Sequence, residues 1–228
     1  MCARTHLTFR PSVRIMCVRT QIACRGQKEI AMTTTAVVTR TVDGHLLPAA
    51  GTWDIDPGHT ELAFIGRHFM LTKVRGRFTR VTGSVTVDED MNASGVNLDI
   101  DMSSVESGNQ ARDDHLRSAE LFDVETHPTA TFRSTRVDWR GSRGTVQGNL
   151  TIHGVTKEVA LEVSFEGHAR DPWGADRAVF TARSTVNRED FGITWNVALE
   201  AGGVLVSKNV QIEIELESVL RIGTHLDV

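Results

Sequence analysis

The sequence Gly108-Asn-Gln-Ala-Arg-Asp-Asp-His-Leu-Arg-Ser-Ala-Glu-Leu-Phe-Asp-Val-Glu-Thr-His-Pro128 contains the one clear helical passage of the chain. It predicts a short charged helix over residues 109–119, and His127-Pro128 bounds the segment because a residue before proline is pushed away from helical geometry. On both sides of it, from about residue 52 to residue 220, apolar and polar residues alternate. One charged helix between amphipathic strands indicates a lid or plug on a closed sheet, not an α/β enzyme.

The alternation predicts about eight antiparallel strands. It is strict from Val96 to Met102 and clearest from Val210 to Leu216, where every second residue is apolar. A period of two is typical of half-buried strands, and no helical stretches lie between them to make parallel crossovers. A sheet with so many strands removes its edges by closing into a barrel. We therefore predict an all-β, antiparallel barrel with one inserted helix, and a short helical turn at Arg67–Leu71.

The domain organisation is predicted as a leader or tail of low order over residues 1–50, followed by the barrel over residues 51–222. Residues 1–31 carry six Arg or Lys side chains against one Glu, a net charge of +5. The net charge of the whole 228-residue chain is −4, so residues 32–228 carry a net charge of −9. Clustered positive charge is what phosphate binding requires, so a nucleic-acid partner is not expected for this acidic barrel.

The leader favours a cytoplasmic protein. Arg14 and Arg19 interrupt every apolar run that could serve as a secretory signal, and no segment approaches the ~20 apolar residues of a membrane span. A periplasmic or secreted location is the alternative, as is a transit peptide, and Met32 is the favoured true start. All three cysteines lie in the leader, which excludes a disulfide-stapled scaffold for the barrel.

Catalytic and metal-binding patterns are weak. His115 follows Asp113 and Asp114 directly, but neighbours at these spacings do not share a helix face, so a charged face anchoring a lid is favoured. No histidine pair shows the His-x-His or His-x-x-x-His spacing beside a carboxylate. A site drawing ligands from adjacent strands is left open. We expect no catalytic residues, no metal and no cofactor. The glycines near Trp195 lack a strand–loop–helix context and indicate bends.

The inward-facing residues predict an apolar bore. Most are Val, Leu, Ile, Ala or Met, which leaves room for a slender ligand in an eight-stranded barrel. Strands of about ten residues at ~3.3 Å each would make such a channel ~33 Å long, which suits a linear hydrocarbon. The predicted lining residues are Leu62, Phe64, Phe78, Val85, Val87, Val96, Leu98, Ile100, Phe132, Leu150, Ile152, Leu161, Val163, Phe180, Trp195, Ile212 and Ile214.

Several short motifs in fixed order resemble the YceI-like polyisoprenoid-binding proteins. They cover the chain from about residue 52 to residue 220, and as an ordered set they are highly specific. The matching segments are Trp53-Asp-Ile-Asp-Pro-Gly-His-Thr60, Arg67-His68, Lys73-Val-Arg-Gly-Arg-Phe78, Gly108-Asn109, Arg112-Asp113, His115-Leu-Arg-Ser118, Phe122-Asp-Val-Glu125, Gly148-Asn-Leu-Thr-Ile-His-Gly-Val-Thr156, Asp171-Pro-Trp-Gly174, Asn187-Arg-Glu-Asp-Phe-Gly-Ile-Thr-Trp-Asn196 and Leu199-Glu-Ala-Gly-Gly-Val-Leu-Val206.

The resemblance implies an elongated lipocalin-like barrel that holds an isoprenoid chain inside, with no catalytic residues. We therefore expect a carrier or buffer for a polyprenyl lipid or isoprenoid quinone, with the helix gating the mouth and transient membrane contact. Lys73, Arg75, Arg77 and Arg112 are candidates for meeting a polar head group, with solvated rim charge as the alternative. A lipid-acting enzyme on the same barrel, a ligand-free stress-response interaction protein and a homodimer through a strand face remain open.

Overall fold

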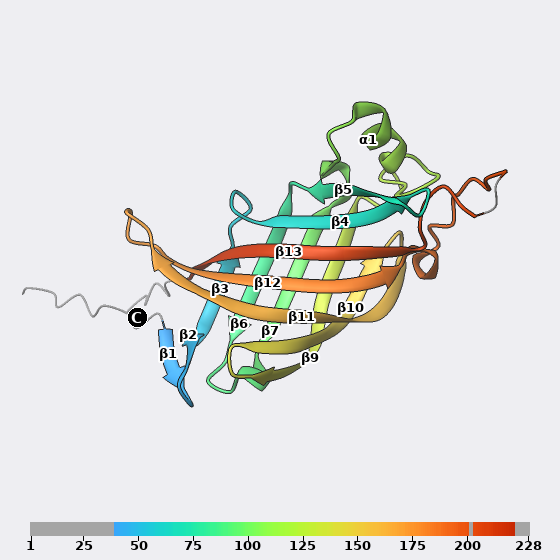
Figure 1. Cartoon of the computed structure of the whole chain (residues 1–228). Coiled ribbons are helices and arrows are strands. Elements are labelled where there is room, and N and C mark those ends of the chain that lie inside the picture. The colour runs from blue at the N-terminus through green and yellow to red at the C-terminus, as the bar shows by residue number, and fades with distance from the viewer. Residues whose placement is uncertain (1–38, 201–202, 222–228) are drawn as a thin grey trace, which may run out of the picture. The chain divides into compact units, whose positions relative to one another are not determined.

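The barrel is closed by eight antiparallel strands. In this computed structural model, residues 39–200 and 203–221 are described, so the expectations for the leader, including Met32, lie outside the described residues. The ring in spatial order is β3 (Gly51–Ile55), β6 (Val81–Val87), β7 (Gly95–Asp101), β9 (Thr129–Arg140), β10 (Arg143–Ile152), β11 (Val155–Arg170), β12 (Asp176–Asn187) and β13 (Asn209–Leu220), which pairs again with β3. Figure 1 shows these strands wrapping around one interior, which confirms the predicted fold class.

A ribbon of three further strands extends the wall at one end. It consists of β4 (Glu61–His68), β5 (Thr72–Phe78) and β8 (Val105–Glu106). The long strand β13 pairs with β3 through Ser218–Leu220 and with β4 through Gln211–Glu215. Along Gln211–Glu215, the neighbour of β13 is therefore β4 instead of β3. β8 pairs with β5 at the outer edge of the ribbon.

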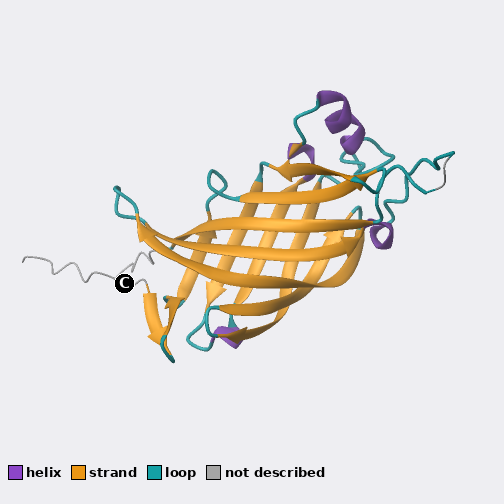
Figure 2. Ribbon diagram, in the orientation of Figure 1, coloured by secondary structure: helices purple, strands orange, loops and turns teal. Residues whose placement is uncertain are grey.

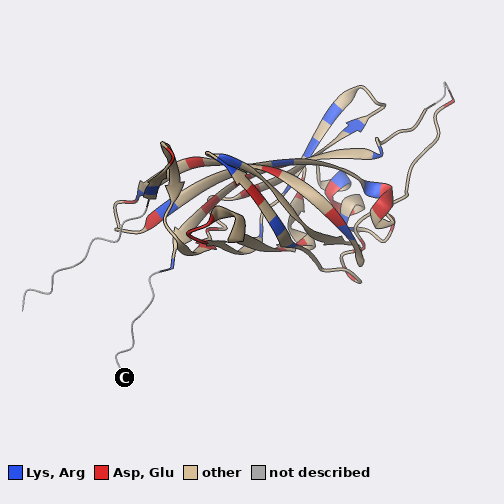
Figure 3. Ribbon diagram, turned by 90° about the horizontal axis from the view of Figure 1, so that it is seen from below, with Lys and Arg blue, Asp and Glu red and all other residues tan. Residues whose placement is uncertain are grey.

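Registered pairs between β12 and β13 show how the alternation fills the core. Phe180 lies opposite Leu216 and Ala182 opposite Ile214, and all four are buried. In the next pair along the strands, Arg183 lies opposite Glu213 on the other face. Figure 3 shows acidic and basic residues interspersed along the strands. A one-residue slip would place every apolar side chain outside, so burial fixes the register.

The helix α1 (Gln110–Arg117) lies against the β5–β8 end of the barrel, and both of its ends are capped. The Asn109 side chain accepts a hydrogen bond from the Arg112 backbone N–H at 3.0 Å, a favourable N-cap. Arg117 donates to the carbonyls of Ser103 (3.0 Å) and Val105 (2.6 Å), which fastens the helix to the barrel wall. The predicted helix over residues 109–119 is confirmed (Figure 2). Three short 3₁₀ helices, η1 (Met91–Ala93), η2 (Met102–Ser104) and η3 (Arg188–Phe191), complete the described elements.

Two local predictions were wrong. Residues 39–48, expected to have little order, form a hairpin of β1 (Thr39–Val42) and β2 (His45–Pro48), because Asp43-Gly44 adopts positive φ at both positions of a tight turn. Leu47 is buried against the barrel core. The expected helical turn at Arg67–Leu71 is instead a hairpin turn, since β4 continues to His68 and then Phe69 and Met70 take positive φ. None of the described helices has the length and apolar character needed to cross a bilayer.

Candidate binding cavity

A cavity of about 390 Å³ occupies the barrel interior at the end that carries α1. Its walls come from β4, β5, β7, β9, β10, β11, β12 and β13, and residues of α1, η3 and the loops beside them line its end. The lining is almost entirely aliphatic and aromatic. The volume lies within the ~300–1,000 Å³ range of small-molecule sites, and its position inside the closed ring makes it the candidate site.

A second cavity of about 70 Å³ lies further along the interior, toward η1. Leu98, Leu161 and Ile214 line both cavities. These three side chains come from β7, β11 and β13 and are all buried. We call these three residues the waist, since they lie between the two cavities. The interior of the barrel is therefore divided into two cavities and is not one open channel.

Every residue predicted to line the interior does so. Twelve of the seventeen line the larger cavity: Leu62, Phe64, Phe78, Leu98, Ile100, Phe132, Leu150, Ile152, Leu161, Trp195, Ile212 and Ile214. The other five line the smaller one: Val85, Val87, Val96, Val163 and Phe180. Contact of these residues with a ligand remains a prediction.

The segment after α1 closes part of the cavity, which alternation along the strands does not predict. Leu121 and Phe122 of this segment line the larger cavity, together with Leu116 of α1. The Phe122 ring lies 5.9 Å from that of Phe64, edge-on, and 5.7 Å from that of Phe78. Aromatic pairs at these separations attract each other beyond the area that they bury. This trio fastens the segment to the β4–β5 wall.

The polar groups of α1 contact the segments on either side of the helix. His115 Nε2 lies 2.8 Å from Glu120, and its ring stands edge-on to Trp195 at 4.5 Å. Asp113 accepts a hydrogen bond from Ser107. Among the described residues, the carboxylate partner of His115 is Glu120.

Of the four predicted head-group cations, Arg112 alone lines the larger cavity. Arg75 donates to Glu61 and Glu213 at 2.6 Å each, and Arg77 donates to Glu106. The Arg75 guanidinium holds the pKa of Glu61 below its usual value. Lys73 lines a separate groove together with Met70 and Asn209. Arg75 and Arg77 are therefore already neutralised by carboxylates.

Arg188 is a cavity residue that the sequence analysis missed. It lies in η3, only 7% of its surface is exposed, and it lines the larger cavity. Nε donates to Ser207 O at 3.0 Å and Nη1 to Ile193 O at 2.6 Å. The buried Nη2 has no hydrogen-bond partner among the described residues. Burial lowers the pKa of the guanidinium, yet an arginine side chain stays charged in proteins.

An unpaired buried donor is rare, because it forfeits its hydrogen bonds to water. Arg188 follows the alternating part of β12 and so falls outside the strand pattern that identified the other lining residues.

The fold and the cavity together define the class of antiparallel β-barrels with an apolar interior site. Comparison with known proteins gives the family. The YceI-like domain model matches residues 53–218, and the chain belongs to this family.

Among its relatives is a UPF0312 protein of Pectobacterium carotovorum. It is 36% identical over 193 residues, which cover 84% of this chain and 97% of that protein. Two solved structures share the fold. BcnA of Burkholderia cenocepacia is 23% identical with a TM-score of 0.62, and the match covers 72% of this chain and 99% of that chain. A polyisoprenoid binding domain from Saccharophagus degradans is 18% identical with a TM-score of 0.57, covering 74% and 98%.

Proposed function

We propose that this protein binds a long-chain isoprenoid lipid, of the polyprenyl or isoprenoid quinone type, in the barrel interior and acts as its carrier or buffer. The observation that supports the proposal is the 390 Å³ cavity, whose walls are mainly apolar side chains from eight strands. The structural relative from Saccharophagus degradans is described as a polyisoprenoid binding domain, which supports the same class of ligand.

The energetics favour exchange rather than permanent capture. Transfer of about forty carbons from water at ~0.8 kcal/mol each would exceed ~30 kcal/mol, whereas measured affinities level off near ~20 kcal/mol. Ordering a flexible chain offsets much of the gain. The competing environment is also a bilayer, where the chain is already out of water. A net preference near zero lets the protein load and unload its ligand.

The head group is proposed to lie beside Arg188, with Arg112 nearer the solvent. The free Nη2 of Arg188 can donate to a quinone carbonyl, a hydroxyl or a phosphate oxygen, and in an apolar surrounding such a charge-assisted hydrogen bond is strong. Arg75 and Arg77 are weaker candidates because their carboxylate partners would have to be displaced. Lys73 remains a candidate for contact outside the cavity.

Transient membrane contact is proposed at the β4–β5 turn. Phe69, Met70 and Leu71 are exposed there, Leu71 by 78%, and the turn lies at the cavity end of the barrel because Phe69 N donates to Leu205 O, a cavity residue. Arg67 and Lys73 flank the three. Apolar side chains beside basic ones suit an anionic bilayer surface.

The test is native mass spectrometry of the purified protein, followed by solvent extraction of whatever it carries. We expect a bound isoprenoid in the parent chain and its loss in Ala130→Trp, because Ala130 is the smallest side chain lining the larger cavity. Thr129→Trp is the matched control, since the neighbouring Thr129 is exposed. If Ala130→Trp fails to fold, Ile152→Phe replaces it, because this substitution adds less volume to the same cavity.

Three outcomes would oppose the proposal. A parent chain without lipid that also takes none up from vesicles supports the ligand-free interaction protein. Extraction of a converted lipid supports the lipid-acting enzyme. Equal lipid content in Ala130→Trp and the parent places the lipid outside the barrel. A cytoplasmic location and a homodimer through a strand face remain proposals, to be checked by fractionation and by sedimentation.

A further inference from the structure

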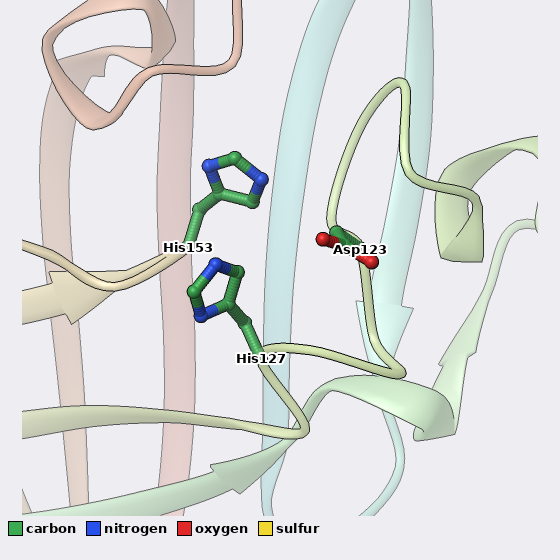
Figure 4. A group of neighbouring side chains, drawn as sticks. All are labelled: Asp123, His127 and His153. Carbon is green, nitrogen blue, oxygen red and sulfur yellow. The ribbon is translucent and has the colours of Figure 1, made fainter.

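Asp123, His127 and His153 form a cluster beside the cavity to which neither the fold comparisons nor the proposed function assigns a role. Asp123 and His127 belong to the segment after α1, and His153 to the turn between β10 and β11. One ligand atom from each residue lies within 4.8 Å of the others. Figure 4 shows the two imidazole rings side by side with the Asp123 carboxylate facing them.

The backbone of each segment aims these side chains. His127 N donates to Asp123 O at 2.7 Å, a single i to i+4 turn that brings both side chains to one side. His153 and Gly154 take φ values of 52° and 73°, as in the two-residue turn of a hairpin. A Cβ at Gly154 would lie 2.8 Å from His127 Cε1, so glycine is needed there for the ring to approach His153.

The three side chains are half-buried and, across residues 39–200 and 203–221, no hydrogen bond or ion pair engages them. The two rings stand edge-on with their centroids 4.7 Å apart. Polar side chains that converge in this way without partners are suited to an added ligand. Two imidazole nitrogens and one carboxylate oxygen are a donor set that zinc uses, with water in the fourth position.

A second cluster of similar composition is not suited to bind a metal ion. Asp56, His59 and Glu217 also lie within 4.8 Å of one another. Arg177 Nη1 already lies 2.6 Å from both of those carboxylates. Its positive charge neutralises the acids and repels a cation, so this second cluster is an ion-pair network.

We propose that Asp123, His127 and His153 bind a divalent transition-metal ion of the zinc class. Ligand distances of ~2.1 Å in a tetrahedral site place donor atoms about 3.4 Å apart, which small rotations about the side-chain bonds reach from the present separations. The bound ion joins the segment after α1, whose Leu121 and Phe122 line the cavity, to the β10–β11 turn. Its effect on lipid release rests on the proposed function, whereas metal binding itself does not.

The experiment titrates Zn²⁺ and then Co²⁺ into the chelator-treated full chain, in which Cys2, Cys17 and Cys24 are replaced by serine so that no thiolate competes. Calorimetry is expected to give one equivalent of bound Zn²⁺, and Co²⁺ to give the visible absorption of a four-coordinate nitrogen and oxygen site. Neither measurement requires lipid, so failure of the metal-site proposal can be distinguished from failure of the proposed function.

The variants are chosen to keep the backbone intact. Asp123→Asn and His153→Asn retain a residue that tolerates positive φ, and His127→Gln keeps a polar side chain of similar reach. Each is expected to weaken Zn²⁺ binding at least about tenfold and to abolish the metal-induced rise in Tm, while its metal-free Tm stays near the parent value. His59→Gln, in the ion-pair network, is expected to bind as the parent does.

The proposal is overturned if the parent chain shows no saturable Zn²⁺ binding. It is equally overturned if the three site variants bind like the parent, or if His59→Gln weakens binding as much as they do.

Discussion

At the scale of single residues, Gly76 allows an aromatic ring to cover the backbone of β5. A Cβ at this position would lie 2.3 Å from Cζ of Phe64, far inside van der Waals contact. The same Phe64 ring lies 5.5 Å from that of Phe78 and forms part of the cavity wall. The absence of a side chain at Gly76 therefore sets the position of the aromatic trio that fastens the segment after α1.

Gly76→Ala is expected to lower the free energy of unfolding by about 1–3 kcal/mol, because the ring must leave its position or the strands must separate. Urea denaturation measures the loss. The double variant Gly76→Ala with Phe64→Leu should recover part of it, since the smaller side chain makes room for the new methyl group. Equal stabilities of the single and double variants would show that the contact is not responsible.

Asp56 is held ionised by Arg177. The two side chains lie 2.6 Å apart, and Arg177 Nε also lies 2.9 Å from Asp171. The guanidinium lowers the pKa of Asp56 from 3.8 to about 2, and His59 contributes further. Because the pKa in the folded state lies below that of the unfolded chain, the contribution to stability is complete above pH ~4 and is lost as the pH falls toward ~2.

Urea midpoints measured across this pH range test the pair. The parent chain is expected to lose about 1–2 kcal/mol more than Asp56→Asn between pH ~4 and pH ~2, since the amide has no charge to lose. Glu158→Gln, an exposed change on β11, serves as control and should follow the parent curve. Parallel curves for the parent and Asp56→Asn would contradict the assigned pKa.

At the scale of elements, the β4–β5 hairpin joins the cavity wall to the exposed apolar turn. Its strands carry cavity residues such as Leu62 and Phe78, and its turn presents Phe69, Met70 and Leu71 to solvent. The opposite end of the barrel offers a comparison, because Trp173 in the turn Asp171–Gly174 is 87% exposed but lines neither interior cavity.

Phe69→Ser combined with Leu71→Ser is expected to slow lipid uptake from anionic vesicles about three- to tenfold, because binding to an interface scales with the apolar area inserted. The rate is measured with a fluorescent polyprenyl probe in the vesicles. Trp173→Ser should leave it unchanged. A loss of rate with Trp173→Ser, and none with the double variant, would place membrane contact at the other end.

At the scale of the whole molecule, the waist divides the interior in which the ligand is proposed to lie. Leu98, Leu161 and Ile214 separate about 390 Å³ from about 70 Å³. They come from β7, β11 and β13, which surround one interior only because the ring of strands is closed. We therefore expect the waist to limit the length of the lipid chain that the cavity accepts, which no single strand encodes.

Leu161→Ala is expected to join the two cavities and to shift the bound lipid toward longer chains, at a cost of about 2–5 kcal/mol in stability. Extraction followed by mass spectrometry reports the chain lengths. Val137→Ala is the matched control, because Val137 lines only the smaller cavity and its truncation leaves the waist intact. Unchanged chain lengths in Leu161→Ala would exclude the waist as the limit.

The sequence by itself determined the barrel, the helix and the side chains that point inward. Burial on one face imposes alternation on each strand, and capping residues such as Asn109 mark the helix start. Both signals are local, so they can be read without knowing which strands are neighbours. Sixteen of the seventeen predicted lining residues lie on strands and face inward for this reason, whereas Trp195 lies in the loop after η3.

Only the tertiary structure decided what lies at the ends of the strands and across the interior. Three features depend on segments far apart in sequence. They are the approach of Asp123 and His127 to His153, the burial of the Arg188 guanidinium and the division of the interior at Leu161. Strand closure sets their separations, and the volumes of facing side chains set the empty space between them. No periodic pattern along the chain records either quantity.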